Sequence, residues 1–133
     1  MCTDKISPQS LHTGIGVVDS QHQTFFVLLK KVRECDSNTD PSDLAAIIDE
    51  LHLYTLYHFE TEEKILEEHN LPTIEEHKAI HMRLVDKIDE FRLENILDSA
   101  TLATTLADFM EKWLINHIQK IDMEDLKIVP GRY

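Results

Sequence analysis

The chain has 133 residues, of which 42% are apolar and 29% charged, a balance that is typical of a single globular domain. Its formal net charge of −12 disfavours nucleic acid and anionic membrane surfaces, so we expect neither as a partner. No apolar run approaches the ~20 residues of a membrane-spanning helix, and the N-terminus has no basic-then-apolar signal pattern.

The two cysteines, Cys2 and Cys35, do not form a CxxC pair. We interpret them as free thiols in a reducing compartment and predict a cytoplasmic location.

Only three glycines and four prolines limit the number of turns, and strand-type alternation is almost absent, which predicts a few long helices. Residues 1–18 are expected to form an irregular N-terminal arm. A first helix, SQHQTFFVLLKKVREC, would follow Asp19 as its N-cap. A second would begin with Asp40 as N-cap and Pro41 at the first helical position, and end near Asn70.

Two further helices are predicted in the C-terminal half. Thr73 and Glu76 have the spacing of a capping box for a third helix. Asp98 or Ser99 would cap a fourth helix that ends before residue 129. Short connections favour antiparallel neighbours. The predicted fold class is therefore all-α, an up-down-up-down four-helix bundle.

The predicted organisation is one domain over residues 1–133, with the bundle at residues 19–129. No internal repeat, linker or low-complexity segment suggests a second unit.

Histidine and acidic residues recur on the apolar faces of these helices. In HFETEE, His58 and Glu62 are four residues apart and share a helix face, and His77 and His81 do so in HKAIH. In an antiparallel bundle, the starts of the first and third helices meet the ends of the second and fourth. Seven residues are therefore predicted to meet at one end of the bundle: His22, His58, Glu62, His77, His81, His117 and Asp122.

Asp122 follows His117 by five residues, which places it ~140° away on a regular helix. It can join the group only if the helix loosens there, for example through a π-type bulge, or if the site lies to one side.

The other histidines and the acidic residues beside the HFETEE motif have simpler interpretations. His12, His52 and His69 are not expected to bind metal, and His52 is expected to be exposed. A solvated acidic face is predicted for Glu60, Glu63, Glu67 and Glu68.

Five imidazoles and two carboxylates exceed the four ligands of a tetrahedral zinc ion. They suit two octahedral ions that share carboxylate bridges and an oxygen bridge, with one coordination position left open. Nitrogen and oxygen ligands without thiolate favour iron, with manganese and zinc as competitors.

The segments GIGVVDSQH, HFETEE, HKAIH and HIQKID resemble those of the hemerythrins, in their single-domain bacterial form, across residues 14–122. The resemblance implies two non-haem irons with an oxo or hydroxo bridge. It assigns His77, His81 and His117 to the coordinatively full iron, and His22 and His58 to the iron with the vacancy. Glu62 and Asp122 would bridge the two.

The resemblance further implies that dioxygen binds at the vacancy, in an apolar pocket that keeps out water. Phe25 stands where the family commonly has a smaller aliphatic residue. The predicted pocket residues are Phe25, Phe59, Trp113, Leu114 and Ile118.

We therefore expect a non-enzymatic dioxygen carrier, store or scavenger, as a monomer or weak homo-oligomer. The alternatives are a di-iron redox enzyme that handles peroxide or nitric oxide, and a sensor of oxygen or iron that signals through a partner.

Overall fold

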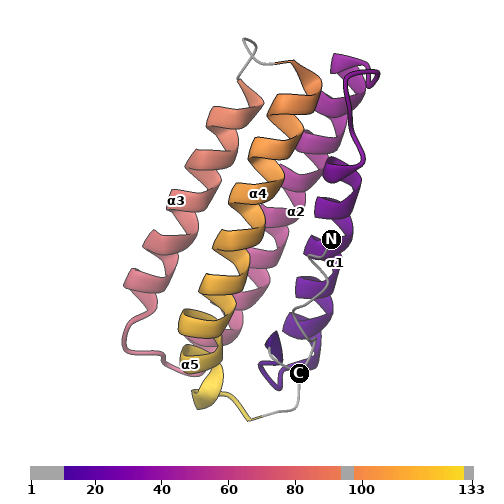
Figure 1. Ribbon diagram of the computed structural model, residues 1–133. Helices are drawn as coiled ribbons and strands as arrows, with labels where there is room; N and C mark the ends of the chain where they lie inside the picture. The colour runs from indigo at the N-terminus through magenta and orange to yellow at the C-terminus, as the bar shows by residue number, and fades with distance from the viewer. Residues whose placement is uncertain (1–10, 94–97, 131–133) are drawn as a thin grey trace.

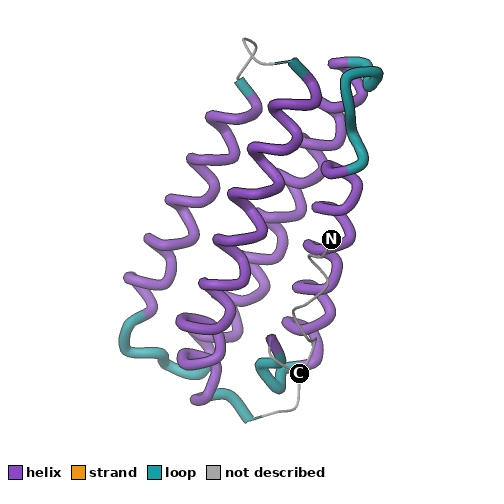
Figure 2. Tube along the Cα trace, in the orientation of Figure 1, coloured by secondary structure: helices purple, strands orange, loops and turns teal. Residues whose placement is uncertain are grey.

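The computed structural model describes residues 11–93 and 98–130, and all regular structure in these ranges is helical (Figure 2). Four long helices run alternately up and down: α1 (Gly16–Arg33), α2 (Pro41–Glu68), α3 (Ile74–Arg92) and α4 (Ser99–His117) (Figure 1). The predicted all-α, up-down-up-down bundle is confirmed. Within the described residues, no helix is long and apolar enough to cross a membrane.

The predicted caps of α2 and α4 are present. Asp40 accepts a hydrogen bond from the Ser42 backbone N–H, and Pro41 opens α2. Asp98 accepts one from the Thr101 backbone N–H at the start of α4. These bonds satisfy N–H groups that have no partner inside the helix.

Three expectations about helix ends were wrong. Helix α1 begins at Gly16, inside the segment predicted to be an arm, and ends at Arg33. Asp19 does not cap it, because its carboxylate turns back to accept hydrogen bonds from Thr13 and the Gly14 N–H. The capping box at Thr73 is absent, because that side chain makes no capping bond to α3.

The fourth helix does not continue regularly to residue 129. After His117 the chain forms a π-helical turn, Ile118–Asp122, then α5 (Met123–Asp125) and a 3₁₀ turn, Leu126–Ile128. Of the two ways in which Asp122 was expected to be able to join the site, the structure shows the loosened helix between His117 and Asp122. A π turn contains more residues than an α-helical turn, because its hydrogen bonds join residues five apart. The extra residue rotates Asp122 towards the core.

Two apolar clusters lie on either side of the predicted site along the bundle axis. The larger one fills the middle of the bundle and includes Phe25, Leu51 and Leu106. The smaller one includes Leu126, which directly follows α5, together with Val18 and Ile65. The site residues fall between these positions in sequence, so apolar side chains enclose the site on both sides.

Candidate metal centre

The seven predicted site residues all lie at the α5 end of the bundle, and none is more than 4% exposed. Helix α1 supplies one, α2 and α3 two each, and α4 and the π turn one each. The cluster, hereafter the seven-residue cluster, consists of His22, His58, Glu62, His77, His81, His117 and Asp122.

Three imidazoles face one oxygen of each carboxylate and form the three-histidine half of the cluster. The Nε2 atoms of His77 and His81 lie 2.7 and 3.1 Å from Oε1 of Glu62. The Nε2 atom of His117 lies 3.0 Å from Oδ1 of Asp122, and His77 Nε2 lies 3.3 Å from the same oxygen. Five side chains thus converge on one point.

The two remaining imidazoles face the other oxygen of each carboxylate and form the two-histidine half. The Nε2 atom of His22 lies 3.3 Å from Oδ2 of Asp122 and 3.9 Å from Oε2 of Glu62. His58 Nε2 lies 3.6 Å from the same Glu62 oxygen. Glu62 and Asp122 therefore lie between the halves. Each of them turns one oxygen to the three-histidine half and the other oxygen to the two-histidine half.

This arrangement has room and donors for two cations. In each half, every residue offers a ligand atom that lies within 4.8 Å of the others, and Glu62 and Asp122 belong to both halves. The donors are imidazole nitrogen and carboxylate oxygen, which suit iron, manganese or zinc better than calcium or magnesium.

Several buried atoms of the cluster lack a hydrogen-bond partner among the residues that the structure describes. They include inward-facing donors and acceptors, and each unpaired one costs about 1–3 kcal/mol. A bound cation would offset the charge of the two carboxylates and would be coordinated by the inward imidazole nitrogens. The unpartnered inward atoms are His22 Nε2, Glu62 Oε2 and both carboxylate oxygens of Asp122.

The electrostatics without a bound cation differ between the histidines. Burial lowers the pKa of His58 to about 4, although the charge of Glu62 opposes this shift. Burial also acts against a charged His77, but its contacts with Asp122 and Glu62 prevail and raise its pKa to about 11. Burial opposes ionisation of Glu62 too, yet its histidine partners lower its pKa to about 2. The Glu62 carboxylate is thus kept ionised, as metal binding requires.

The outer nitrogens of three histidines are hydrogen-bonded to residues for which the sequence predicted no role at the site. The Nδ1–H of His58 donates to Gln21 Oε1, that of His77 to Asp125 Oδ2, and that of His81 to Glu63 Oε2, each at 2.7 Å. A hydrogen bond at Nδ1 fixes the ring and aims Nε2 inward, where it can bind a metal ion once its proton is released.

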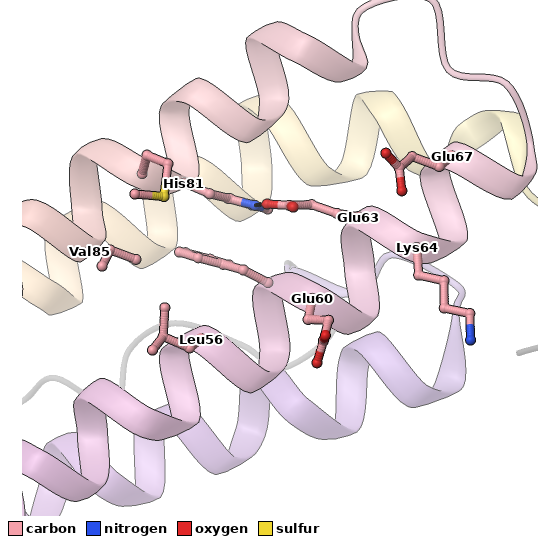
Figure 3. A pocket seen from close by; sticks show the side chains of 9 residues that line it. Leu56, Glu60, Glu63, Lys64, Glu67, His81 and Val85 are labelled. Atoms are coloured by element: carbon pink, nitrogen blue, oxygen red, sulfur yellow. Dashed lines mark hydrogen bonds and ion pairs between the residues drawn. The ribbon is translucent and has the colours of Figure 1, made fainter.

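Glu63 was expected on a solvated face, but its side chain is only 23% exposed. It lines a groove of about 380 Å³ between α2 and α3. Figure 3 shows Glu63 and His81 pointing towards each other there, with Leu56 and Val85 on the apolar side of the groove. Glu63 therefore connects His81 of the cluster with the surface groove.

Aromatic rings border both halves of the cluster. Phe59 stacks on His81 with ring centroids 3.6 Å apart, and Trp113 stacks on His117 at 4.4 Å. Phe25 is fully buried and meets His58 edge-on at 5.2 Å. The other two predicted pocket residues, Leu114 and Ile118, are buried as well. Phe59 and Trp113 thus stack on the three-histidine half, and Phe25 lies beside the two-histidine half.

The three histidines that were not expected to bind metal lie outside the cluster. His12 contacts Asp19, and His69 Nδ1 lies 2.9 Å from the Ile65 carbonyl oxygen. His52 was expected to be exposed, but its side chain is only 13% exposed and lies 3.1 Å from Asp89.

Comparison with known proteins agrees with this geometry. The family model of the hemerythrin HHE cation binding domain matches residues 13–129. A bacteriohemerythrin of Stenotrophomonas maltophilia (strain R551-3) is 30% identical over 112 residues, which are 84% of this chain and 72% of that protein. A myohemerythrin of Riftia pachyptila is 36% identical over 115 residues, covering 86% of this chain and 85% of that one.

A crystal structure of wild-type hemerythrin matches the fold with a TM-score of 0.78 and 26% identity, over 90% of this chain and 92% of that one. The family model covers nearly the whole bundle, and the resemblance first seen in HFETEE and HKAIH is confirmed. The chain belongs to the hemerythrin family.

Proposed function

We propose that this protein binds dioxygen reversibly at two non-haem irons held by the seven-residue cluster, as a carrier, store or scavenger. The observation that carries the proposal is the placement of Glu62 and Asp122, each of which turns one oxygen to either histidine half. Two carboxylates in this position suit a bridged pair of ions. The hemerythrin names of the relatives support the same conclusion.

The two halves differ by one imidazole, which supports a division of labour. His77, His81 and His117 would hold the coordinatively full iron, and His22 and His58 the iron with an open position. Two ferrous ions would supply the electrons for reversible dioxygen binding. An oxo or hydroxo bridge would join the two ions in their oxidised, ferric form. The protein supplies the ligands, their orientation and a site closed to bulk water.

His58→Leu tests the assignment of the open position. The variant removes an imidazole of the two-histidine half, so we expect the oxygen-dependent absorption change to disappear while iron remains in the three-histidine half. The measurement is the absorption spectrum over cycles of aeration and degassing, together with iron analysis.

His52→Leu is the matched control, since His52 lies on the same helix but pairs with Asp89 outside the cluster. A full oxygenated spectrum in the His58→Leu variant would refute the assignment.

Phe25→Leu tests the apolar wall. Its ring is fully buried beside His58, so a smaller side chain should admit water and speed irreversible oxidation of the iron severalfold. The cost in stability should be modest, about 1 kcal/mol. The rate is followed by absorption in air. Phe26→Leu changes the neighbouring, partly buried ring, and equal rates in the two variants would exclude a gating role for Phe25.

A further inference from the structure

The hydrogen bonds behind the histidines are distributed unequally between the halves. Two histidines of the three-histidine half donate to carboxylates, His77 to Asp125 and His81 to Glu63. In the two-histidine half, His58 donates to the neutral amide of Gln21. The Nδ1 atoms of His22, in this half, and of His117, in the three-histidine half, have no hydrogen-bond partner among the described residues.

The two carboxylates come from different parts of the chain. Glu63 lies on α2, Asp125 lies on α5, and both reach histidines of α3. Their side chains are 23% and 20% exposed, so each is partly withdrawn from water while it holds its ring. Two negative charges thus stand behind the three-histidine half.

This difference has a direct consequence for metal binding. A carboxylate behind an imidazole makes the ring a stronger electron donor, whereas an amide fixes its orientation without adding charge. Glu62 and Asp122 serve both halves, so they do not distinguish them. What distinguishes the halves is the number of imidazoles and the charge behind them, and both favour the three-histidine half.

We propose that the two halves bind metal ions with different affinities, so that the three-histidine half fills first. Glu63 and Asp125 are positioning residues that raise the affinity of the three-histidine half. The neutral Gln21 leaves the affinity of the two-histidine half lower. The inference rests on the proposed pair of ions. The weaker half is also the one with the open position, so the ion that meets dioxygen is the ion that enters last and leaves first.

Gln21 is well placed for a substitution that adds a charge. It is 6% exposed, and its backbone carbonyl accepts a hydrogen bond from the Tyr54 hydroxyl at 3.1 Å. Its amide nitrogen makes only a long contact, 3.5 Å, with Thr61 Oγ1. Gln21→Glu therefore keeps the shape and the acceptor for His58, loses one weak bond and adds a negative charge.

The experiment titrates the metal-free full chain with Co²⁺ under anaerobic conditions, against a competing chelator, and fits two dissociation constants. For the unmodified chain we expect two unequal constants. Glu63→Gln and Asp125→Asn should each weaken the tighter step by about 10–100-fold and leave the weaker step nearly unchanged. Gln21→Glu should tighten the weaker step alone.

Glu60→Gln is the matched control, because Glu60 is exposed and lines the same groove, yet belongs to neither half of the cluster. Circular dichroism verifies that each variant is folded. Two equal constants in the unmodified chain, or variants that shift both steps alike, would overturn this inference and leave the pair of ions standing. A chain that binds a single Co²⁺ ion would overturn the proposed function as well.

Discussion

Asp122→Ala is expected to reduce the iron content from a pair of ions to one or none per chain, while the helical fold is retained. Asp122 is fully buried, and its two oxygens face different halves of the cluster. Its loss therefore removes a ligand atom from each ion at once. Without metal, Asp122 also raises the pKa of Glu62 by repulsion, so its removal relieves one unfavourable interaction in the metal-free protein.

The measurement is elemental analysis of iron after anaerobic reconstitution, with circular dichroism as the test of folding. Glu124→Ala is the matched control, since this exposed side chain lies two residues away and pairs only with Lys127 among the described residues. If Asp122→Ala retained the iron content of the unmodified chain, Asp122 would not bridge the ions.

Removal of iron with a chelator is expected to lower the thermal stability strongly. Without cations, two buried carboxylates repel each other, and several inward atoms lack a hydrogen-bond partner in residues 11–93 and 98–130. A ligand present at about 100 times its dissociation constant stabilises the fold by ~2.7 kcal/mol. For a domain of this size, such a loss corresponds to a fall in melting temperature of about 10 °C.

Differential scanning calorimetry of the iron-loaded and chelated protein measures this difference. The Asp122→Ala variant supplies the control, because chelation should change its melting temperature much less. Equal melting temperatures for the loaded and chelated unmodified protein would mean that the cluster does not depend on metal for its stability.

Much of this organisation could be predicted from periodicity alone. His58 and Glu62 share a face because they are four residues apart, and the antiparallel order of helices then brings them to the same end as His77 and His117. The cap at Asp40 was equally predictable, because Pro41 excludes most alternatives. These features depend on local spacing, which the sequence states directly.

Other features depend on contacts that spacing does not encode. Asp19 has the side chain of an N-cap, but its bonds to Thr13 and Gly14 depend on how the preceding loop folds. Glu63 follows Glu62 in an acidic run, and only the packing of α2 against α3 places it behind His81. The one available signal was chemical: a metal-binding histidine generally needs a partner for its outer nitrogen.

The arrangement of Gln21 and Asp125 illustrates the same limit. Gln21 precedes His22 in the chain but holds His58 on the neighbouring helix. Asp125 lies on α5, which follows the π turn, and there its carboxylate reaches His77 near the start of α3. Such partners could be expected in kind from the sequence, but not identified by residue.

Anomalous diffraction at the iron absorption edge, from crystals of the iron-loaded protein, tests the central claim most directly. We predict two peaks inside the bundle, one among His77, His81 and His117 and one beside His22 and His58, with Glu62 and Asp122 between them. A single peak, or peaks away from these side chains, would contradict the account.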